Sequence, residues 1–350
     1  MTSGYGVTIT GVGQYAPSGI LSNEDFEKLV DTSDEWIVQR TGMKRRHIAA
    51  PQQATSDLAL PAALGALQAA GKRPGDVECI VVSTATPDYL FPATASIVAA
   101  RLGLHGVPSF DLSIACSGFV YGLMTGAALV RSGIYKNVLL IGAETLSKIT
   151  DYTDRSTCVL FGDGAGAVLL ERSAENCFLG SNLGTDGSDI SLLYLPGGGS
   201  RIPFSTNHDS REQRLGYIRM QGQSVFKFAV QQMAASSLAA LDQAGLTPAD
   251  VDYVVPHQAN LRILDATMKM LKLPQSKCIV NIEEYGNTSS ASIPMALSDG
   301  VSDGRIKKDN ILVFVAFGGG LSWGASVWRW KSAPVVNALP PSAAAPSSTS

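Results

Sequence analysis

Two stretches of this chain are nearly the same: Ala70-Gly-Lys-Arg-Pro-Gly-Asp-Val-Glu-Cys-Ile-Val-Val82 and Ala244-Gly-Leu-Thr-Pro-Ala-Asp-Val-Asp-Tyr-Val-Val255. Each begins with an Ala-Gly pair that is typical of a helix end. Each continues through a proline and an Asp-Val pair into a short apolar run, which is typical of a buried strand. Since one copy lies in each half of the chain, we interpret them as an internal duplication.

Short apolar runs alternate with helical patterns on both sides of these stretches. Because helices follow strands throughout, the pattern predicts an α/β fold with helices on the faces of the sheets. The expected strands are 7–12, 79–83, 109–114, 138–143, 165–170, 179–184, 251–255, 278–281, 311–316 and 325–330. The expected helices are 23–30, 34–40, 56–70, a segment ending near 101, 119–130, 224–244, 262–271 and 290–300.

Length and composition narrow the class of protein. A chain of 350 residues exceeds the size at which one hydrophobic core stops growing, so two core regions are expected. Hydrophobic residues make up 45% and charged residues only 16%, which indicates a large interior and a surface partly covered by a partner chain. The net charge of −3 and the lack of a long basic run argue against nucleic-acid binding.

The cysteines and the N-terminus indicate a cytoplasmic protein. The five cysteines are scattered without CxxC spacing, so neither a zinc site nor a disulfide framework is predicted. The first residues do not resemble a signal peptide, and no apolar run approaches the length of a membrane span. We expect no metal and no membrane association.

The composition also predicts domain boundaries. We expect an N-terminal half over residues 1–178, a C-terminal half over 179–332, and a tail over 333–350. The segment 183–215, rich in glycine, serine and charge, is interpreted as a surface excursion between the halves. The tail is rich in alanine, proline and serine, and we expect it to be flexible because it has too little apolar surface to bury.

Cys116 is the first candidate for chemistry. An apolar run leads into it, and a Ser-Gly pair and a long apolar helical segment follow, so the thiol lies at the start of a buried helix. Unpaired N–H groups and the helix dipole favour negative charge there, which predicts an easily ionised, nucleophilic thiolate. The alternative is a small buried hydrophobic residue, which is what most lone cysteines are.

Three more segments place polar or flexible residues where a predicted strand ends. His257 follows strand 251–255, Asn287 lies in a Gly-Asn-Thr-Ser-Ser segment, and Phe317-Gly-Gly-Gly320 follows strand 311–316. Sheets of this class place their sites at the carboxyl ends of strands. Taken singly, His257 could be a structural histidine and Asn287 part of a plain turn and helix cap.

Together these segments resemble a known family. Ala-Cys116-Ser-Gly-Phe, Pro-His257-Gln-Ala-Asn-Leu-Arg-Ile, Gly-Asn287-Thr-Ser-Ser-Ala-Ser-Ile-Pro and Ala-Phe-Gly-Gly-Gly320-Leu-Ser-Trp-Gly are similar to the motifs of bacterial β-ketoacyl-acyl-carrier-protein synthase III, the initiating condensing enzyme of fatty-acid synthesis. The similarity covers roughly residues 5–331. It implies the thiolase fold, with two similar halves that each hold a mixed five-stranded sheet in an αβαβα arrangement, and a homodimer.

The resemblance also implies a mechanism. Cys116 would take an acyl group from acyl-CoA, and the N–H groups of Cys116 and Gly319 would form the oxyanion hole. His257 and Asn287 would then stabilise the enolate that forms when malonyl-acyl-carrier protein loses carbon dioxide. Coenzyme A and the phosphopantetheine of the carrier protein are substrate carriers, and no other cofactor is implied.

Further positions carry over from the family's motifs. The family implies coenzyme A binding by Trp36, Arg40, Arg155, Phe226 and Asn260. It implies contact with the carrier protein by Lys227, Gln258, Ala259, Asn260, Arg262 and Lys269. Phe91 would cross a dimer interface to close the acyl pocket, and the ordinary bulk of its loop favours a short acyl primer such as acetyl. Gln223 departs from the family, which commonly has asparagine there.

Three other functions remain open at this point. A related condensing enzyme or acyltransferase of quinolone or polyketide biosynthesis would carry the same catalytic residues. A Cys-His-Asn hydrolase would use His257 as a base that activates water. A non-catalytic binding module would form no acyl adduct on Cys116.

Overall fold

The computed structural model describes residues 4–205, 213–331 and 335–337. The first of its sheets contains both parallel and antiparallel strands. Strands β5, β4 and β6 are parallel to one another, whereas β7 runs antiparallel to both β6 and β1. Among the described residues the strand order is β14-β1-β7-β6-β4-β5. The bounds are β1 Gly6–Tyr15, β4 Ile80–Ser83, β5 Ser109–Leu112, β6 Asn137–Thr145, β7 Asp163–Ser173 and β14 Val335–Asn337.

The second sheet follows the same plan. Strand β11 is parallel to β12, and β13 runs antiparallel to both β12 and β8. The order is β11-β12-β13-β8, and an isolated parallel bridge between Val254 and Cys278 extends it past β11. The bounds are β8 Phe178–Thr185, β11 Tyr253–Pro256, β12 Ile311–Gly318 and β13 Ser322–Arg329.

The two sheets confirm the internal duplication. The order β1-β7-β6-β4-β5 in the first matches β8-β13-β12-β11 and the Cys278 bridge in the second. Strands β4 and β11, which follow the two copies of the repeated stretch, therefore occupy equivalent places. The strand counts differ from five because β14 adds to the first sheet, while residues 278–281, expected to be a strand, form only the bridge.

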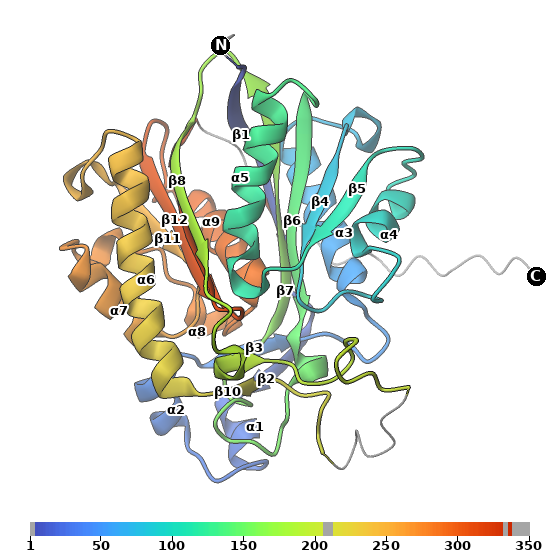
Figure 1. Ribbon diagram of the computed structural model, residues 1–350, viewed down its shortest axis with the longest axis vertical. Coiled ribbons are helices and arrows are strands. Elements are labelled where there is room, and N and C mark those ends of the chain that lie inside the picture. Colours follow the sequence, from blue (N-terminus) through green and yellow to red (C-terminus); the bar gives the residue numbers. More distant parts are fainter. Residues whose placement is uncertain (1–3, 206–212, 332–334, 338–350) are drawn as a thin grey trace, which may run out of the picture.

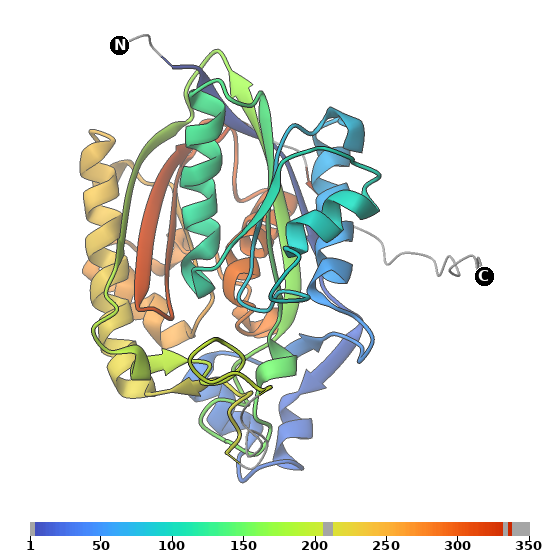
Figure 2. The same cartoon turned by 45° about the vertical axis from the view of Figure 1, so that its right-hand side comes forward.

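Helices alternate with the sheets to form five layers, as Figures 1 and 2 show. Helix α3 packs on β1, β7 and β6, and α4 packs on β4 and β5. Helices α5 and α9 lie between the sheets, and α6 covers β8, β12 and β13, with α7 packed against it. The αβαβα arrangement is confirmed. The bounds are α3 Thr55–Ala69, α4 Thr94–Arg101, α5 Gly118–Arg131, α6 Gly222–Gln243, α7 Leu261–Met270 and α9 Ser292–Ser302.

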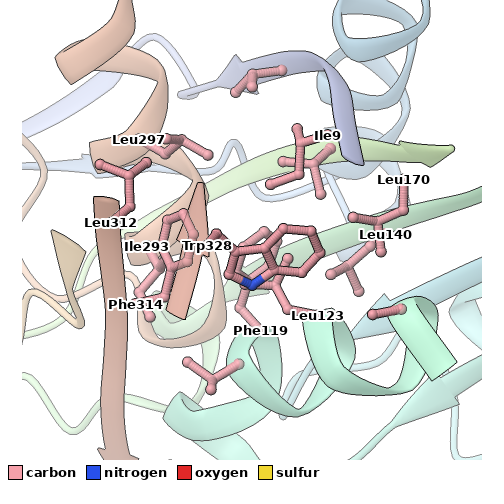
Figure 3. Close-up of a cluster of buried hydrophobic side chains, with 14 of the residues drawn as sticks. Ile9, Phe119, Leu123, Leu140, Leu170, Ile293, Leu297, Leu312, Phe314 and Trp328 are labelled. Carbon is pink, nitrogen blue, oxygen red and sulfur yellow. The ribbon is translucent and has the colours of Figure 1, made fainter. Parts of the chain in front are cut away.

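The central core lies around α5 and α9. Phe119 and Leu123 of α5 meet Ile293 of α9 and Trp328 of β13 in one buried cluster (Figure 3). Helix α5 lies close to the first sheet because Gly122 has no side chain: a Cβ there would come within 2.4 Å of Leu140. The turn before α5, where Cys116 lies, is therefore held between two sheets.

Shorter elements close one end of the layers (Figure 1). They are α1 Asn23–Glu27, α2 Asp34–Thr41, α8 Ile282–Tyr285, β2 Gly19–Ser22, β3 Arg45–Ile48, β9 Leu193–Tyr194 and β10 Arg219–Met220. Arg46 anchors this region: its guanidinium is buried, donates to Asn23 Oδ1 at 2.5 Å and to the carbonyl of Val159, and lies over the Phe26 ring. Burial lowers the pKa of Arg46 to about 10.

Part of the expected tail pairs with the first sheet. Val335–Asn337 form β14, parallel to β1, and this strand is not among those expected from the sequence, while the flexibility of the tail stays a prediction. The edge of β1 offers unpaired backbone groups to which a Val-Val pair with high β-propensity can bind. The rest of the predicted tail, residues 333–334 and 338–350, lies outside the described residues, and the boundary at 178/179 stays a prediction.

Candidate active site

A cavity of about 310 Å³ joins the surface to the candidate catalytic residues. The exposed Arg40 and Arg262 lie at its outer part, and the buried His257 and Asn287 line its inner part together with Cys116. These residues come from segments far apart in the chain, and both halves contribute. The structure therefore brings together the three side chains that the sequence singled out.

Cys116 lies in a tight turn directly before α5. The preceding residue, Ala115, has a φ of +43°, in the left-handed region that non-glycine residues rarely adopt. Behind the turn lies Gly318 at the end of β12, where a Cβ would come within 2.8 Å of the Cys116 backbone nitrogen. The strained turn and this close approach fix where the thiol points, as pre-organised sites often do.

The ionisation of Cys116 differs from the expectation. Burial raises the pKa of the thiol to about 12, and the carboxyl of Glu144 contributes in the same direction. Desolvation therefore opposes the ionisation that the helix start was expected to favour, although the Cys116 side chain keeps some exposure to the cavity. In the resting protein Cys116 is a neutral thiol that must lose its proton as it reacts.

His257 is held on two sides. It follows β11, and its backbone N–H donates to the Val315 carbonyl at 2.8 Å. Its ring lies edge-on to Phe317, with centroids 5.7 Å apart, and its Nδ1 is 2.7 Å from the Ser292 hydroxyl. Burial lowers the pKa of His257 to about 3, against the opposing effect of the Ser289 carbonyl. The imidazole is therefore neutral at physiological pH.

The amide of Asn287 has a defined orientation. The Ser289 backbone N–H donates to Asn287 Oδ1 at 2.9 Å, so Oδ1 is the acceptor and Nδ2 is left as a donor. The backbone of Asn287 is held between Leu160 and Gly162 by hydrogen bonds of 2.9 and 3.0 Å. The local structure thus presents an N–H donor to the cavity.

A buried carboxyl group that no sequence motif indicated lies near the nucleophile. Glu144, at the end of β6, is fully buried and accepts hydrogen bonds from Thr86 Oγ1 at 2.6 Å, Ser290 Oγ at 2.8 Å and the Ala85 N–H at 3.1 Å. Burial raises the pKa of Glu144, and these donors oppose the rise. An acidic residue directly after the apolar run 138–143 was the available signal.

The turn that holds Cys116 has a counterpart in the second half. Ser289 has a φ of +48°, begins a short 3₁₀ turn and precedes α9, just as Ala115 begins the turn that precedes α5. We call these two segments, 115–117 and 289–291, the paired turns. Ser290 thus occupies the place in the second turn that Cys116 occupies in the first.

Gly319 lies on the other side of Cys116. The two residues line a second, smaller cavity of about 110 Å³ whose other walls are mainly apolar. Those walls include Leu146, Ile149, Phe161, Leu193, Leu195 and Ile218. Cys116 therefore lies between the long cavity that reaches the surface and a small apolar one.

Trp36, Arg40 and Arg155 meet at the outer part of the long cavity. The Arg155 guanidinium lies 4.4 Å from the Trp36 ring centroid, and that of Arg40 lies 5.7 Å from it. Arg155 also forms an ion pair with Asp31 at 3.8 Å. A flat base could stack between Trp36 and Arg155 only if the two moved apart, because they are already in contact.

Asn260 and Phe226 also line this cavity. Asn260 caps α7: its Oδ1 accepts from the Arg262 N–H at 2.9 Å, and its Nδ2 donates to the Arg40 carbonyl at 3.0 Å. Its amide therefore ties α7 to α2. The Arg262 guanidinium lies 5.9 Å from the Phe226 ring centroid, so these two residues form one wall.

One expected contact of the carrier protein is corrected. Gln258 is buried, its Nε2 donates to the carbonyls of Pro256 and Ile279, and its Oε1 accepts from the Asn281 N–H. Its amide is used inside the protein and does not reach the surface. Ala259 is also buried and lines the long cavity, whereas Lys227, Arg262 and Lys269 are exposed.

Phe91 lies away from both cavities. It is 86% exposed, and its neighbours Tyr89 and Leu90 are 63% and 82% exposed. We call residues 89–91 the hydrophobic loop. Nothing within one copy of the described chain covers this loop, so Phe91 would reach an acyl pocket only in a second copy.

Two further properties concern the described residues only. In the ranges 4–205, 213–331 and 335–337, no group of three or more His, Cys, Asp and Glu side chains is placed to hold a metal ion. No helix in those ranges combines the length and the apolar character that a membrane crossing requires.

Comparison with known proteins identifies the family. Residues 110–187 match the family model for 3-oxoacyl-[acyl-carrier-protein (ACP)] synthase III, and residues 241–330 match the model for its C-terminal part. The β-ketoacyl-[acyl-carrier-protein] synthase III of Caldanaerobacter subterraneus subsp. tengcongensis is 52% identical over 324 residues, which cover 92% of this chain and 97% of that protein.

Solved structures agree with this assignment. The crystal structure of 3-oxoacyl-[acyl-carrier-protein] synthase III from Aquifex aeolicus is 44% identical, has a TM-score of 0.86, and matches 93% of this chain and 100% of its own. The priming β-ketosynthase of the R1128 polyketide pathway is 33% identical, has a TM-score of 0.89, and matches 95% and 99%. The chain therefore belongs to the β-ketoacyl-[acyl-carrier-protein] synthase III family of condensing acyltransferases.

Proposed function

We propose that this enzyme joins the acyl group of an acyl-CoA to malonyl-acyl-carrier protein, with loss of carbon dioxide, through an acyl-Cys116 intermediate. The observation that carries this proposal is the convergence of Cys116, His257 and Asn287 on one cavity that reaches the surface. A thiol can hold an acyl group, and two neutral hydrogen-bond donors can stabilise an enolate. Each group needed for the two half-reactions is present.

In the first half-reaction the Cys116 sulfur attacks the thioester carbon of acyl-CoA. The thiol loses its proton, the carbon–sulfur bond to coenzyme A breaks, and coenzyme A leaves with a proton as the free thiol. The N–H groups of Cys116 and Gly319 are proposed to stabilise the oxyanion of the tetrahedral intermediate, since both residues border the small apolar cavity.

In the second half-reaction the malonyl group loses carbon dioxide. The electron pair of the broken carbon–carbon bond forms an enolate, whose oxygen is proposed to accept hydrogen bonds from His257 and Asn287. The low pKa of His257 supports this role, because the ring is neutral and is not a strong acid at the pH of the reaction. The carbanion then attacks the acyl-Cys116 carbonyl and releases the thiolate.

The second cavity supports a short acyl primer. Its volume of about 110 Å³ and its apolar walls suit an acyl chain of a few carbons attached to Cys116. The exposed hydrophobic loop at residues 89–91 supports a homodimer in which Phe91 of one copy closes the acyl pocket of the other. Acetyl-CoA or another short acyl-CoA is therefore the proposed primer.

Basic residues of α6 and α7, among which Arg262 lines the long cavity, support the proposed contact with an acidic carrier protein. Arg262 and Lys269 are two turns apart on α7, and Lys227 lies on α6, which packs against α7. All three are exposed. Charge complementarity of this kind guides the encounter of partner proteins.

The remaining parts of the proposal concern carriers and location. Trp36, Arg40 and Arg155 are proposed to bind the nucleotide of coenzyme A, with Phe226 and Asn260 beside the pantetheine. Coenzyme A and phosphopantetheine act as substrate carriers, with no separate cofactor. A cytoplasmic location is supported by the five cysteines, which are all free thiols.

A direct test loads the protein with acyl groups. The full chain is incubated with a panel of acyl-CoAs, and the mass of the Cys116 peptide is measured. We expect an adduct with a short acyl group, no adduct in Cys116→Ala, and an unchanged adduct in Cys79→Ala, which changes a cysteine that lines neither cavity. If no acyl-CoA adds mass to an intact Cys116, the proposal is wrong.

A second measurement separates a synthase from a hydrolase. The His257→Ala enzyme is expected to keep acyl transfer to Cys116 but to lose carbon dioxide release from malonyl-acyl-carrier protein. A hydrolase that uses His257 as its base would instead lose the acylation step.

One related function also has a specific observation in its favour. The polyketide-priming β-ketosynthase superimposes with a TM-score of 0.89. Its mechanism would use the same residues, so the second candidate is a priming enzyme of a specialised polyketide or quinolone pathway. Comparing condensation rates with fatty-acid and polyketide carrier proteins distinguishes the two candidates.

A further inference from the structure

The neutral ring of His257 can carry its single N–H proton on either nitrogen. Only one of the two forms can help the proposed decarboxylation, because the nitrogen that faces the substrate must be a donor. Nδ1 is 2.7 Å from Ser292 Oγ, which leaves Nε2 as the nitrogen available to the cavity. Whatever lies at Nδ1 therefore decides whether Nε2 carries the proton.

Ser292 lies at the first position of α9 and is buried. Its Oγ accepts a hydrogen bond from the Gln258 backbone N–H at 3.3 Å. The same Oγ lies 2.7 Å from the Ser289 carbonyl and 2.7 Å from His257 Nδ1. A hydroxyl has one proton, so Ser292 can donate to the carbonyl or to the ring but not to both at once.

The two choices have opposite results at the cavity. If Ser292 donates to the carbonyl, Nδ1 must carry the ring proton and donate to Oγ, which leaves Nε2 without a proton. If Ser292 donates to Nδ1, the ring proton lies on Nε2. The Ser289 carbonyl is satisfied in either case, because it also accepts the Ser292 backbone N–H.

We propose that Ser292 is a positioning residue that donates its hydroxyl proton to Nδ1 of His257 and so keeps the ring proton on Nε2, toward the malonyl thioester. The inference rests on the proposed function, in which His257 donates to the enolate oxygen. Phe317 holds the ring from another side, so the ring is fixed in orientation while Ser292 fixes its tautomer. Asn287 is set in a similar way by the Ser289 N–H.

The paired turns explain why Ser292 is in this place. Helices α5 and α9 each follow a turn that begins with a left-handed residue, and the first residues of the helices are Gly118 and Ser292. A Cβ at Gly118 would come within 1.7 Å of Ser83 Oγ, so no side chain fits there. In the second half the same helix position carries a hydroxyl directed at His257.

The tautomer can be measured directly in the wild-type chain. The sequence has four histidines, so labelling with ¹⁵N-histidine gives few ring signals, and the His257 signals are assigned by their loss in His257→Asn. At neutral pH we expect the protonated-nitrogen shift for Nε2 and the unprotonated one for Nδ1. The opposite assignment in the wild-type protein overturns the proposal without any variant at Ser292.

Variants then test the role of Ser292. In Ser292→Ala we expect carbon dioxide release from malonyl-acyl-carrier protein to fall on the order of 100-fold, the typical cost of one lost oxyanion donor. The rate at which acyl-CoA acylates Cys116 should change less than about threefold, because in the proposed mechanism the donor at His257 Nε2 acts only in the decarboxylation step. Ser292→Thr, which keeps the hydroxyl, should restore most of the decarboxylation.

A matched control and the stability of the variants separate the possible failures. Ser237 is a buried serine whose hydroxyl donates to the Met233 carbonyl within α6, and Ser237→Ala should leave both half-reactions unchanged. Equal loss of acylation and decarboxylation in Ser292→Ala would indicate a merely structural role and overturn the proposal. If Ser292→Ala does not fold, the proposal is tested by the tautomer of His257 in the wild type and by the decarboxylation rate of Ser292→Thr. A wild-type enzyme that forms no acyl-Cys116 would contradict the proposed function instead.

Discussion

Gly318 lies directly behind Cys116, close enough that a Cβ at Gly318 would be 2.8 Å from the Cys116 backbone nitrogen and 3.1 Å from its Cβ. Real side chains do not tolerate such contacts with backbone, so either β12 or the turn at Cys116 would have to move. The end of a strand in one half thus sets the position of the nucleophile in the other.

This contact predicts the effect of a single methyl group. In Gly318→Ala we expect acylation of Cys116 to slow by about 100-fold, because a displacement near 1 Å costs that much in a pre-organised site. The adduct is followed by mass against time. Gly75→Ala is the control, since nothing lies within 4 Å of a Cβ there. An acylation rate equal to that of the control would show that the turn does not need this contact.

The raised pKa of Cys116 predicts how alkylation depends on pH. With a pKa of about 12, the thiolate fraction should rise about tenfold for each pH unit between pH 7 and pH 10. The rate of iodoacetamide modification of the Cys116 peptide should follow it without a plateau. A plateau below pH 9 would mean that the thiol ionises as in an ordinary cysteine or more easily.

His257 predicts a loss of stability in acid. Its folded-state pKa is lowered to about 3, so between pH 6.5 and pH 3 the unfolded chain binds a proton that the folded protein does not. The free energy of unfolding should therefore fall as the pH falls, by up to about 1.4 kcal/mol per pH unit from this group. The free energy of unfolding, measured with denaturant at several pH values, should depend less steeply on pH in His257→Ala than in the wild type. Identical slopes would exclude this contribution.

Stacking at Trp36 predicts a selective loss of affinity. We expect Trp36→Ala to raise the KM for acyl-CoA by about tenfold, the value of one aromatic contact with a base and a guanidinium, with little change in kcat. An acyl-pantetheine thioester, which has no nucleotide, serves as the control substrate and should be unaffected. Equal effects on both substrates would point to damage of α2 rather than to nucleotide binding.

The hydrophobic loop predicts an interface between two copies of the chain. Phe91→Ser removes a side chain that is 86% exposed in one copy. We expect the dissociation constant of the proposed dimer to rise by about tenfold or more. Sedimentation velocity across a dilution series measures this. Ile134→Ser, at a residue that is 63% exposed, is the matched control. If both variants dissociate as the wild type does, the loop is not the interface.

The repeated stretch and the strand ends made much of this molecule predictable. Two copies of one pattern indicated two equivalent strands, and β4 and β11 indeed occupy equivalent places. Cys116, His257 and Asn287 were recognisable because polar residues at strand ends stand out against apolar runs. The alternation of strands and helices predicts helices on the faces of the sheets, whereas the five-layer αβαβα arrangement was implied by the family resemblance.

Other features depend on contacts that no local pattern reveals. The pKa of Cys116 is raised by burial, which depends on how distant segments enclose the thiol. The family resemblance implies that Gln258 contacts the carrier protein, yet its amide turns inward to Pro256 and Ile279. Strand β14 forms on an edge whose availability only the assembled sheet shows.

The paired turns have a consequence for stoichiometry. A duplicated fold has two equivalent positions for a reactive side chain, and Ser290 occupies the second position. Its oxygen is fully buried and lies 2.8 Å from both the Ser83 carbonyl and Glu144, so it is engaged on the inside of the protein. If Cys116 carries the proposed acyl group, we therefore expect one acyl group per chain, because the equivalent residue of the second turn is already engaged.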